Sequence, residues 1–317
     1  MKRRLMLVLT IILSIFMIGC GASNNSKKVS EETSSNGKLK VYTSFYAMYD
    51  FATKIGGDKV EVTNLVAPGV EPHDWEPKPA DIVNLEKADV FIYNGLGMEH
   101  WTDKVLKSLK NDKILVVEAS KGANLIKSEH NHEHDAEEDK HEENEYDPHV
   151  WLSPSNAKIE LENIKNAFIE ADVENKDYYE NNYKKYVSEL DSLDKKFKEE
   201  LSNVKNKEVI VAHEAFGYLC REYGLTQVAI EGLMADSEPT AARMAEIIDF
   251  AKEHKIKVIF FEELVNPSVA ETIAKSIGAK TEVLNPLEGI TKEDEANGED
   301  YISIMTRNLN AIKAALE

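Results

Sequence analysis

Short β-branched runs alternate with longer helical stretches in both halves of the chain. In the first half, strands are predicted at 40–43, 60–66, 90–93 and 114–117, and helices at 45–55, 78–87 and 98–109. In the second half, strands are predicted at 209–212, 227–230, 258–261 and 282–284, with helices beginning at 214, 239, 268 and 300. Such a succession predicts parallel sheets with helices on both faces, so the expected fold class is α/β.

One long amphipathic stretch separates these two alternating regions. From 176 to about 203, an apolar residue recurs at every third or fourth position: Tyr179, Tyr183, Val187, Leu190, Leu193, Phe197 and Leu201. This spacing predicts a single helix with one apolar stripe, about 42 Å long. We therefore expect two α/β lobes, at 38–173 and 206–317, joined by a connecting helix at 174–205.

The N-terminus has the features of an export signal. Three basic residues precede a 14-residue apolar stretch, which is too short to span a bilayer comfortably. It ends in Met17-Ile18-Gly19-Cys20, which resembles a bacterial lipoprotein box apart from Met17 and Ile18. We expect a signal peptide at 1–19, a lipid anchor on Cys20 and a flexible tether at 20–37, which is rich in Ser and Asn. The alternative is a simple signal peptide with an incidental cysteine.

The net charge limits the possible binding partners, and the cysteine content limits the possible disulfides. The chain has 57 acidic and 38 basic residues, a net charge of −19, and removal of the leader makes it more negative still. This balance argues against binding to nucleic acid or to an anionic membrane surface. The only cysteine besides Cys20 is Cys220, so no internal disulfide is expected once Cys20 is acylated. We expect a monomer that depends on its apolar core.

A short motif occurs twice, as Glu71-Pro72-His73-Asp74-Trp75 and as Asp147-Pro148-His149-Val150-Trp151. Both copies read acid, Pro, His, any residue, Trp, and they use two of the three tryptophans in the chain. From the composition, one Pro-His-x-Trp copy is expected roughly 0.002 times by chance. Each copy holds a histidine on a proline-stiffened loop beside a bulky aromatic residue, an arrangement typical of a binding site.

Four residues form the candidate metal site: His73, His149, His213 and Glu288. His73 follows the second predicted strand, His213 follows the strand at 209–212, and Glu288 follows the strand at 282–284. Ligands of open parallel sheets bind beyond the carboxyl ends of strands, so these side chains are expected to meet. Three imidazoles and one carboxylate suit tetrahedral Zn²⁺, whereas Mn²⁺ prefers more oxygen ligands.

The fourth ligand and the supporting residues are less determined by the sequence. Glu214, Glu262 and Glu263 also lie near strand ends, and water could take the place of Glu288. Asp147 either orients a ligand or caps the turn before Pro148. The two motif tryptophans either wall the site or pack in the core, and both roles are compatible.

The segment at 129–145 is a candidate accessory metal site. It has nine acidic residues, one lysine and four histidines, at positions His130, His132, His134 and His141. With no apolar residue larger than alanine, it is predicted to be a mobile loop that binds Zn²⁺ or Cu²⁺ weakly. The alternative is a solvated insertion that binds no metal.

At these residues the chain resembles the metal-type solute-binding proteins of bacterial ABC importers, of the zinc-binding ZnuA/AdcA kind. The most specific matching segments are 70–77, 147–154, 212–218 and 284–288. The resemblance implies two pseudo-symmetric α/β lobes, one long rigid connecting helix, and a buried metal bound by His73, His149, His213 and an acid of the second lobe. Manganese-binding relatives tend to have Glu in place of His213, so the resemblance places this sequence among the zinc-binding members of the family.

The predicted function is a non-catalytic, extracytoplasmic zinc receptor, lipid-anchored to the cell membrane. It would deliver Zn²⁺ to an ABC permease powered by a cytoplasmic ATPase. A zinc hydrolase is disfavoured because four protein ligands leave no open position for water, and neither H-E-x-x-H nor G-x-S-x-G occurs. The remaining alternatives are a surface metal buffer or adhesin, and a Mn²⁺-specific receptor.

Overall fold

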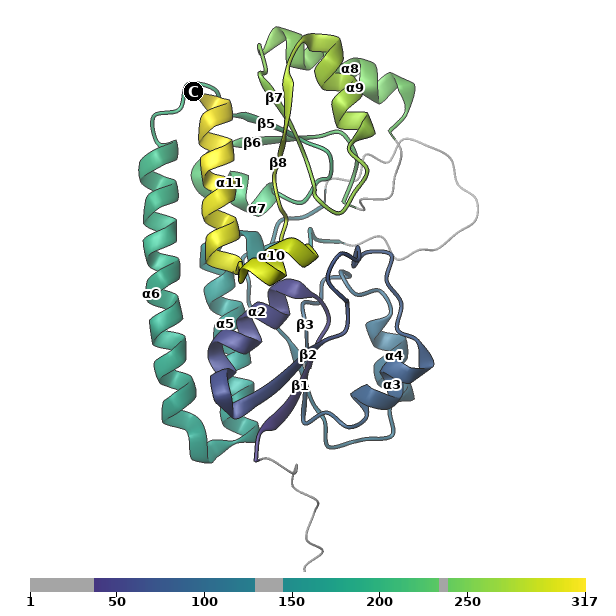
Figure 1. Cartoon of the computed structure of the whole chain (residues 1–317), viewed down its shortest axis with the longest axis vertical. Helices are drawn as coiled ribbons and strands as arrows, with labels where there is room; N and C mark the ends of the chain where they lie inside the picture. Colours follow the sequence, from purple (N-terminus) through teal and green to yellow (C-terminus); the bar gives the residue numbers. More distant parts are fainter. Residues whose placement is uncertain (1–36, 129–144, 234–238) are drawn as a thin grey trace, which may run out of the picture. The chain divides into compact units, whose positions relative to one another are not determined.

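The computed structural model describes residues 37–128, 145–233 and 239–317, and it has two four-stranded parallel sheets (Figure 1). The first sheet contains β1 (Leu39–Thr43), β2 (Val60–Asn64), β3 (Val90–Tyr93) and β4 (Leu115–Glu118), in the order β2-β1-β3-β4. The second contains β5 (Glu208–Val211), β6 (Thr226–Ala229), β7 (Val258–Phe261) and β8 (Lys280–Val283), in the order β6-β5-β7-β8. In both sheets the first strand lies between the second and the third. The α/β class and the pseudo-symmetry of the two lobes are therefore confirmed.

Three of the four central strands, β3, β5 and β7, are almost continuously apolar, whereas β1 contains Lys40. Val41 of β1 lies opposite Val62 of β2 and Val90 of β3. Val41 and Val90 are fully buried, as is Ile210 in the equivalent strand β5. Parallel sheets covered by helices on both faces require such continuous apolar runs, which is why the short β-branched stretches predicted the strands well.

Helices connect and cover the strands. Those of the first half are α2 (Tyr46–Gly56), α3 (Pro79–Leu85), α4 (Thr102–Ser108) and α5 (Pro154–Ala171). Those of the second half are α7 (Gly217–Tyr223), α8 (Ala241–Glu253), α9 (Ser268–Ile277), α10 (Lys292–Asn297) and α11 (Tyr301–Leu316). Short 3₁₀ turns lie at η1 (Gly57–Lys59), η2 (Val150–Leu152) and η3 (Val173–Asn175).

The long helix α6 (Lys176–Leu201) packs against both lobes. Its 26 residues extend about 39 Å. In its first half, the Tyr186 hydroxyl donates a hydrogen bond to Asp50 of α2 at 2.9 Å. Nearer its end, the Phe197 ring stacks on Tyr223 of α7, with centroids 4.7 Å apart. One apolar stripe thus contacts helices from both halves of the chain.

The C-terminal helix α11 returns to the first lobe. The Tyr301 hydroxyl donates to the carbonyl oxygen of Trp151 at 2.6 Å, and its ring lies 5.0 Å from that of Phe51 in α2. Lys54 of α2 forms an ion pair with Asp300, which caps α11. The main core cluster therefore contains residues from both lobes and from α6.

Two predicted helices begin later than expected. The one predicted from 98 begins at Thr102, because Gly95, Leu96 and Gly97 have positive φ angles of 93°, 57° and 84° and form a turn first. The one predicted from 214 begins at Gly217, because the Glu214 N–H instead donates to the carbonyl oxygen of Gly232 at 3.0 Å.

Helices α5 and α10 lie outside the predicted elements. Each has a side-chain N-cap: Ser153 accepts from the Asn156 N–H, and Thr291 accepts from the Asp294 N–H. Among the described residues, no helix has both the length and the apolar character needed to cross a membrane. The predicted leader and Cys20 lie outside the described residues, as do His130, His132, His134 and His141.

Candidate metal centre

The four predicted ligands come together at the ends of strands and loops of both lobes. His73 lies in the loop after β2, His149 directly before η2, His213 shortly after β5, and Glu288 in the loop after β8. All four residues are buried, with exposed fractions between 0 and 3 %. One potential ligand atom from each lies within 4.8 Å of the others. The sequence therefore located a cluster that could hold a metal ion.

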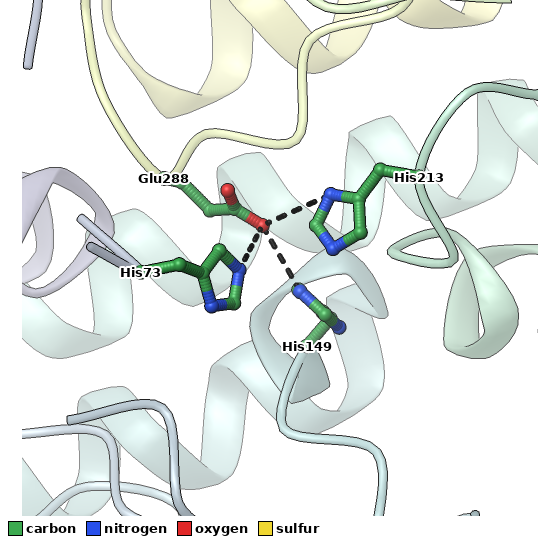
Figure 2. A group of neighbouring side chains, drawn as sticks. All are labelled: His73, His149, His213 and Glu288. Atoms are coloured by element: carbon green, nitrogen blue, oxygen red, sulfur yellow. Dashed lines mark ion pairs between the residues drawn. The ribbon is translucent and has the colours of Figure 1, made fainter. Parts of the chain in front are cut away.

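One oxygen of Glu288 faces all three imidazoles (Figure 2). Its Oε1 atom lies 3.0 Å from His149 Nε2, 3.4 Å from His73 Nε2 and 3.9 Å from His213 Nδ1. The imidazole centroids are 4.9 to 5.5 Å apart. Three nitrogens and one oxygen thus surround a common point, the number and type of ligands that Zn²⁺ prefers.

Five buried polar atoms of this cluster make no hydrogen bond of good geometry, although Glu288 Oε1 lies at ion-pair distance from His149 Nε2 and His73 Nε2. They are both ring nitrogens of His73, Nε2 of His149 and both carboxylate oxygens of Glu288. Buried polar groups without partners are costly and uncommon in folded proteins. A cation at the centre would satisfy the atoms that face it. The donor set therefore fits a metal ion better than a closed hydrogen-bond network.

Asp147 orients the His149 ring. Its Oδ1 atom lies 2.7 Å from His149 Nδ1 and also accepts the His149 backbone N–H at 2.9 Å. A hydrogen bond at Nδ1 favours the tautomer whose Nε2 lone pair points toward Glu288. Both roles considered for Asp147 are therefore supported: the contact to Nδ1 orients the ligand, and the bond from the His149 backbone N–H caps the turn at Pro148.

His213 is held by two acceptors. Glu262 Oε1 lies 3.0 Å from its Nδ1, and the carbonyl oxygen of Leu233 lies 2.9 Å from its Nε2. Burial by itself lowers the pKa of His213, but the charges of Glu262 and Glu288 outweigh it and raise the pKa to about 10. Without metal, His213 is therefore a cation that donates from both nitrogens, and metal binding requires one of these bonds to open.

The charges of the cluster stabilise one another. Burial alone would raise the pKa of Glu288, yet the imidazoles of His73 and His213 hold it well below its usual range. Burial likewise opposes the charged form of His149, but Asp147 and Glu288 raise its pKa. A proton on the imidazoles and a metal ion are thus alternative partners of the same carboxylate.

Trp151 connects the loop of His149 to that of Glu288. Its ring centroid lies 5.3 Å from that of His149, and its indole N–H donates to the carbonyl oxygen of Pro286 at 2.7 Å. Trp75 is only half-buried and pairs with Trp101 at 5.3 Å. Of the two motif tryptophans, Trp151 is therefore the one that borders the centre.

The loop before Glu288 has an unusual backbone. Leu287 has a φ angle of 60°, a region that non-glycine residues rarely adopt. Its N–H donates to the Asn285 side chain at 2.7 Å, and Asn285 is bonded twice to Asn308 of α11. The Glu288 carbonyl oxygen accepts the Tyr46 N–H of the first lobe at 3.3 Å. These contacts fix the backbone from which the Glu288 side chain projects.

Two acidic residues near the centre were not singled out by sequence reasoning. Glu262 was considered only as an alternative fourth ligand, and Glu71 only as part of the motif. Glu71 accepts the His73 backbone N–H at 3.1 Å. Burial, followed by the charges of Glu288 and Glu262, raises the pKa of Glu71 to about 8. The place of Glu262 at the end of β7 and the motif position of Glu71 were the only signals for them in the sequence.

Comparison with known proteins identifies the family of this chain. The family described as zinc-uptake complex component A, periplasmic (ZnuA), matches residues 41–315. The high-affinity zinc uptake system protein ZnuA of Bacillus subtilis is 47 % identical over 97 % of both chains. The zinc-binding lipoprotein AdcA of Streptococcus pneumoniae is 39 % identical over 98 % of this chain, which spans 60 % of the length of that protein.

A solved structure extends the comparison to the fold. The crystal structure of the Zn(II)-bound ZnuA-like domain of Streptococcus pneumoniae AdcA is 40 % identical. The structural alignment covers 88 % of this chain and 99 % of that domain, with a TM-score of 0.76. With a family match over most of its length and relatives well above 30 % identity, this chain belongs to the ZnuA family of zinc-uptake complex components.

Proposed function

We propose that this protein is an extracytoplasmic receptor that captures Zn²⁺ with His73, His149, His213 and Glu288. It then delivers the ion to the permease of an ABC importer, which a cytoplasmic ATPase drives. The observation that carries the proposal is the set of five buried nitrogen and oxygen atoms on three of these residues that make no hydrogen bond. A cation at the centre would satisfy the atoms of this set that face it, which gives a physical reason for the set to exist.

The donor set favours zinc as the cargo. Three imidazole nitrogens with one carboxylate oxygen match a four-coordinate zinc site, whereas Mn²⁺ prefers more oxygen ligands. Four protein ligands also close the coordination shell, while a catalytic zinc keeps an open position for water. A binding protein is therefore the better reading than a hydrolase. The names of the Bacillus and Streptococcus relatives, which refer to zinc uptake and zinc binding, support the same cargo.

The organisation predicted from the sequence completes the proposal. Residues 1–19 act as a signal peptide, Cys20 carries the lipid anchor, and 20–37 form the tether. The lobes at 38–173 and 206–317 hold the ligands, with the connecting helix at 174–205 between them. The histidines at 129–145 act as an accessory metal site. The protein works as a monomer, in keeping with four ligands supplied by one chain.

A competitive zinc titration tests the proposal. Residues 37–317 would be compared with and without 129–145, after removal of bound metal by a chelator. We expect one tight equivalent in both forms, because the four ligands lie outside the deleted segment. His213→Ala in the shortened form should lose that tight equivalent. His254→Ala changes a half-buried histidine outside the proposed ligand set and should keep it. Tight binding that disappears with 129–145 would instead favour a metal buffer.

A further inference from the structure

The sequence motif at 212–218 continues past the ligand His213 into the first turn of α7, and the metal centre described above does not use that part of it. Gly217 and Tyr218 of this turn lie beside Asp147, the residue that orients His149. The second lobe therefore reaches a ligand loop of the first lobe through two residues that bind no metal themselves.

The Tyr218 hydroxyl holds the main chain of Asp147. The Tyr218 side chain is fully buried, and its hydroxyl donates to the Asp147 carbonyl oxygen at 2.6 Å. The hydroxyl oxygen also accepts the Ile126 backbone N–H at 3.0 Å. Because the Asp147 N–H donates to the Ile126 carbonyl oxygen at 3.0 Å, the three residues form a closed set of hydrogen bonds. The backbone of Asp147 is thus fixed from two sides, as buried polar groups require.

Gly217 leaves room for the Asp147 carboxylate. The φ angle of Gly217 is not positive, so the backbone conformation does not require glycine at this position. A methyl group there would lie 2.8 Å from Asp147 Oδ2, closer than Cβ atoms approach other atoms, while the next atom is 3.6 Å away. The carboxylate would have to rotate, because the end of a side chain yields more easily than backbone. Since Asp147 Oδ1 lies 2.7 Å from His149 Nδ1, that rotation would move the acceptor away from the imidazole.

Helix α7 is itself anchored at its start. The Phe216 N–H donates to the side chain of Gln227 in β6 at 2.6 Å, which ties the first turn to the second sheet. The Arg221 guanidinium lies 5.1 Å from the Tyr218 ring centroid and donates to the Leu125 carbonyl oxygen at 3.1 Å. A helix held by the sheet on one side and by the 124–126 segment on the other is a rigid support for Asp147.

We propose that Gly217 and Tyr218 are positioning residues of the zinc site, which hold Asp147 so that His149 presents its Nε2 atom to the metal. This inference rests on the proposed function. Residues that orient a ligating histidine commonly change metal affinity about 10- to 100-fold, although they do not touch the metal. His213 and α7 belong to one continuous segment. That segment therefore supplies one ligand directly and orients a second ligand, which comes from the other lobe.

Gly217→Ala tests the proposal most directly, with Zn²⁺ affinity measured by competition against a chromophoric chelator. We expect affinity to fall by at least about fivefold, because the added methyl group displaces the Asp147 carboxylate. Gly56→Ala is the matched control, since its methyl group would crowd Val60 at the start of β2. The control should lower the melting temperature and leave zinc affinity within about twofold. Affinity in Gly217→Ala equal to that of the control would overturn the proposal.

A double-mutant cycle separates this role from a general disturbance of the fold. In an Asp147→Ala background there is no carboxylate to displace, so adding Gly217→Ala should change zinc affinity by less than about twofold. An equal loss with and without the carboxylate would overturn the proposal, because Gly217→Ala would then act elsewhere, for example through His213.

Tyr218→Phe is the milder variant if Gly217→Ala is unstable by circular dichroism. We expect at least about threefold weaker zinc binding, because the Asp147 carbonyl oxygen loses its donor. Tyr179→Phe is the control, since Tyr179 is also fully buried and its hydroxyl donates to Asp172 at 2.8 Å. Equal affinity in the two tyrosine variants would overturn the role of Tyr218. Failure of the unaltered protein to bind one tight zinc would instead refute the proposed function itself.

Discussion

Trp151 donates its indole N–H to the carbonyl oxygen of Pro286 at 2.7 Å, and this bond joins the His149 loop of the first lobe to the Glu288 loop of the second. The two residues are 135 positions apart in the sequence. The ring also lies against His149, so a single buried side chain positions two of the four proposed ligands. Zinc affinity is therefore expected to depend on a residue that does not touch the metal.

Replacement of Trp151 by Phe tests this dependence. Phe keeps an aromatic ring but leaves the buried Pro286 carbonyl without its donor, which costs about 1–3 kcal/mol of stability. Because supporting contacts usually change metal affinity by about 10- to 100-fold, zinc should bind at least about tenfold more weakly. Isothermal titration calorimetry, together with thermal unfolding, would measure both effects.

Trp101→Phe is the matched control. Trp101 is also buried, but it packs against Trp75 and Phe91 in a separate cluster. It should lower the melting temperature and leave zinc affinity within about twofold, because supporting contacts act only on the ligands they touch. If both variants lost affinity equally, the effect would be one of general stability, and the link between the two ligand loops would carry no special role.

The charge of Glu288 should be as important as its shape. Glu288→Gln keeps one oxygen near the three imidazoles but removes the negative charge that they surround. A residue that binds the metal directly should contribute at least as much to zinc affinity as a residue that only orients a ligand. We therefore expect zinc affinity to fall by more than about tenfold. A competition assay against a chromophoric chelator would show this. Exposed Glu253→Gln is the control, and binding as tight as in the unaltered protein would point to a water molecule as the fourth ligand.

Zinc binding should release protons. His213 has its pKa raised to about 10 and is therefore protonated at neutral pH in the metal-free protein. A metal ion must displace that proton, so affinity should rise about tenfold per pH unit for each proton released while the pH stays below this pKa. Calorimetry at one pH in two buffers of different ionisation enthalpy counts the protons. We expect at least one at pH 7.5; equal affinity at pH 5 and pH 7.5 would contradict the histidine set.

The convergence of the four candidate ligands could be predicted from the sequence for a physical reason. His73 and His149 stand in a repeated motif, and His213 and Glu288 follow strands whose carboxyl ends meet at one edge. Local patterns of this kind can be recognised in the amino-acid sequence alone. The strands themselves were predictable because short, doubly buried β-branched runs have few other stable arrangements.

The contacts that hold the candidate ligands in place could not be predicted in the same way. Glu262 lies 49 residues from His213, and no local pattern couples the two positions. The Trp151–Pro286 bond and the return of Tyr301 to the first lobe likewise depend on long-range packing. Helix starts were misplaced where a positive φ angle, as at Leu96, inserts a turn that hydrophobic spacing does not record.

Asp50 should make stability depend on pH at a place remote from the metal. Burial, only partly offset by Lys54 and by the Tyr186 hydrogen bond, raises its pKa from 3.8 to about 6. A carboxyl group whose pKa is raised by folding stabilises the folded state fully below its unfolded pKa. That contribution is lost as the pH rises through the folded value, here between pH 4 and 6. A shift of this size corresponds to about 3 kcal/mol.

Asp50→Asn removes the titration but keeps an oxygen that can accept the Tyr186 hydroxyl. Relative to the unaltered protein, the variant should therefore gain about 3 kcal/mol in free energy of unfolding between pH 4 and pH 8. Urea unfolding of the metal-free protein at both pH values would measure the difference. Asp249→Asn, whose side chain is 83 % exposed, should show no such change. Parallel pH dependence in the Asp50 variant and the unaltered protein would mean that Asp50 stays ionised in the folded state, held so by Lys54.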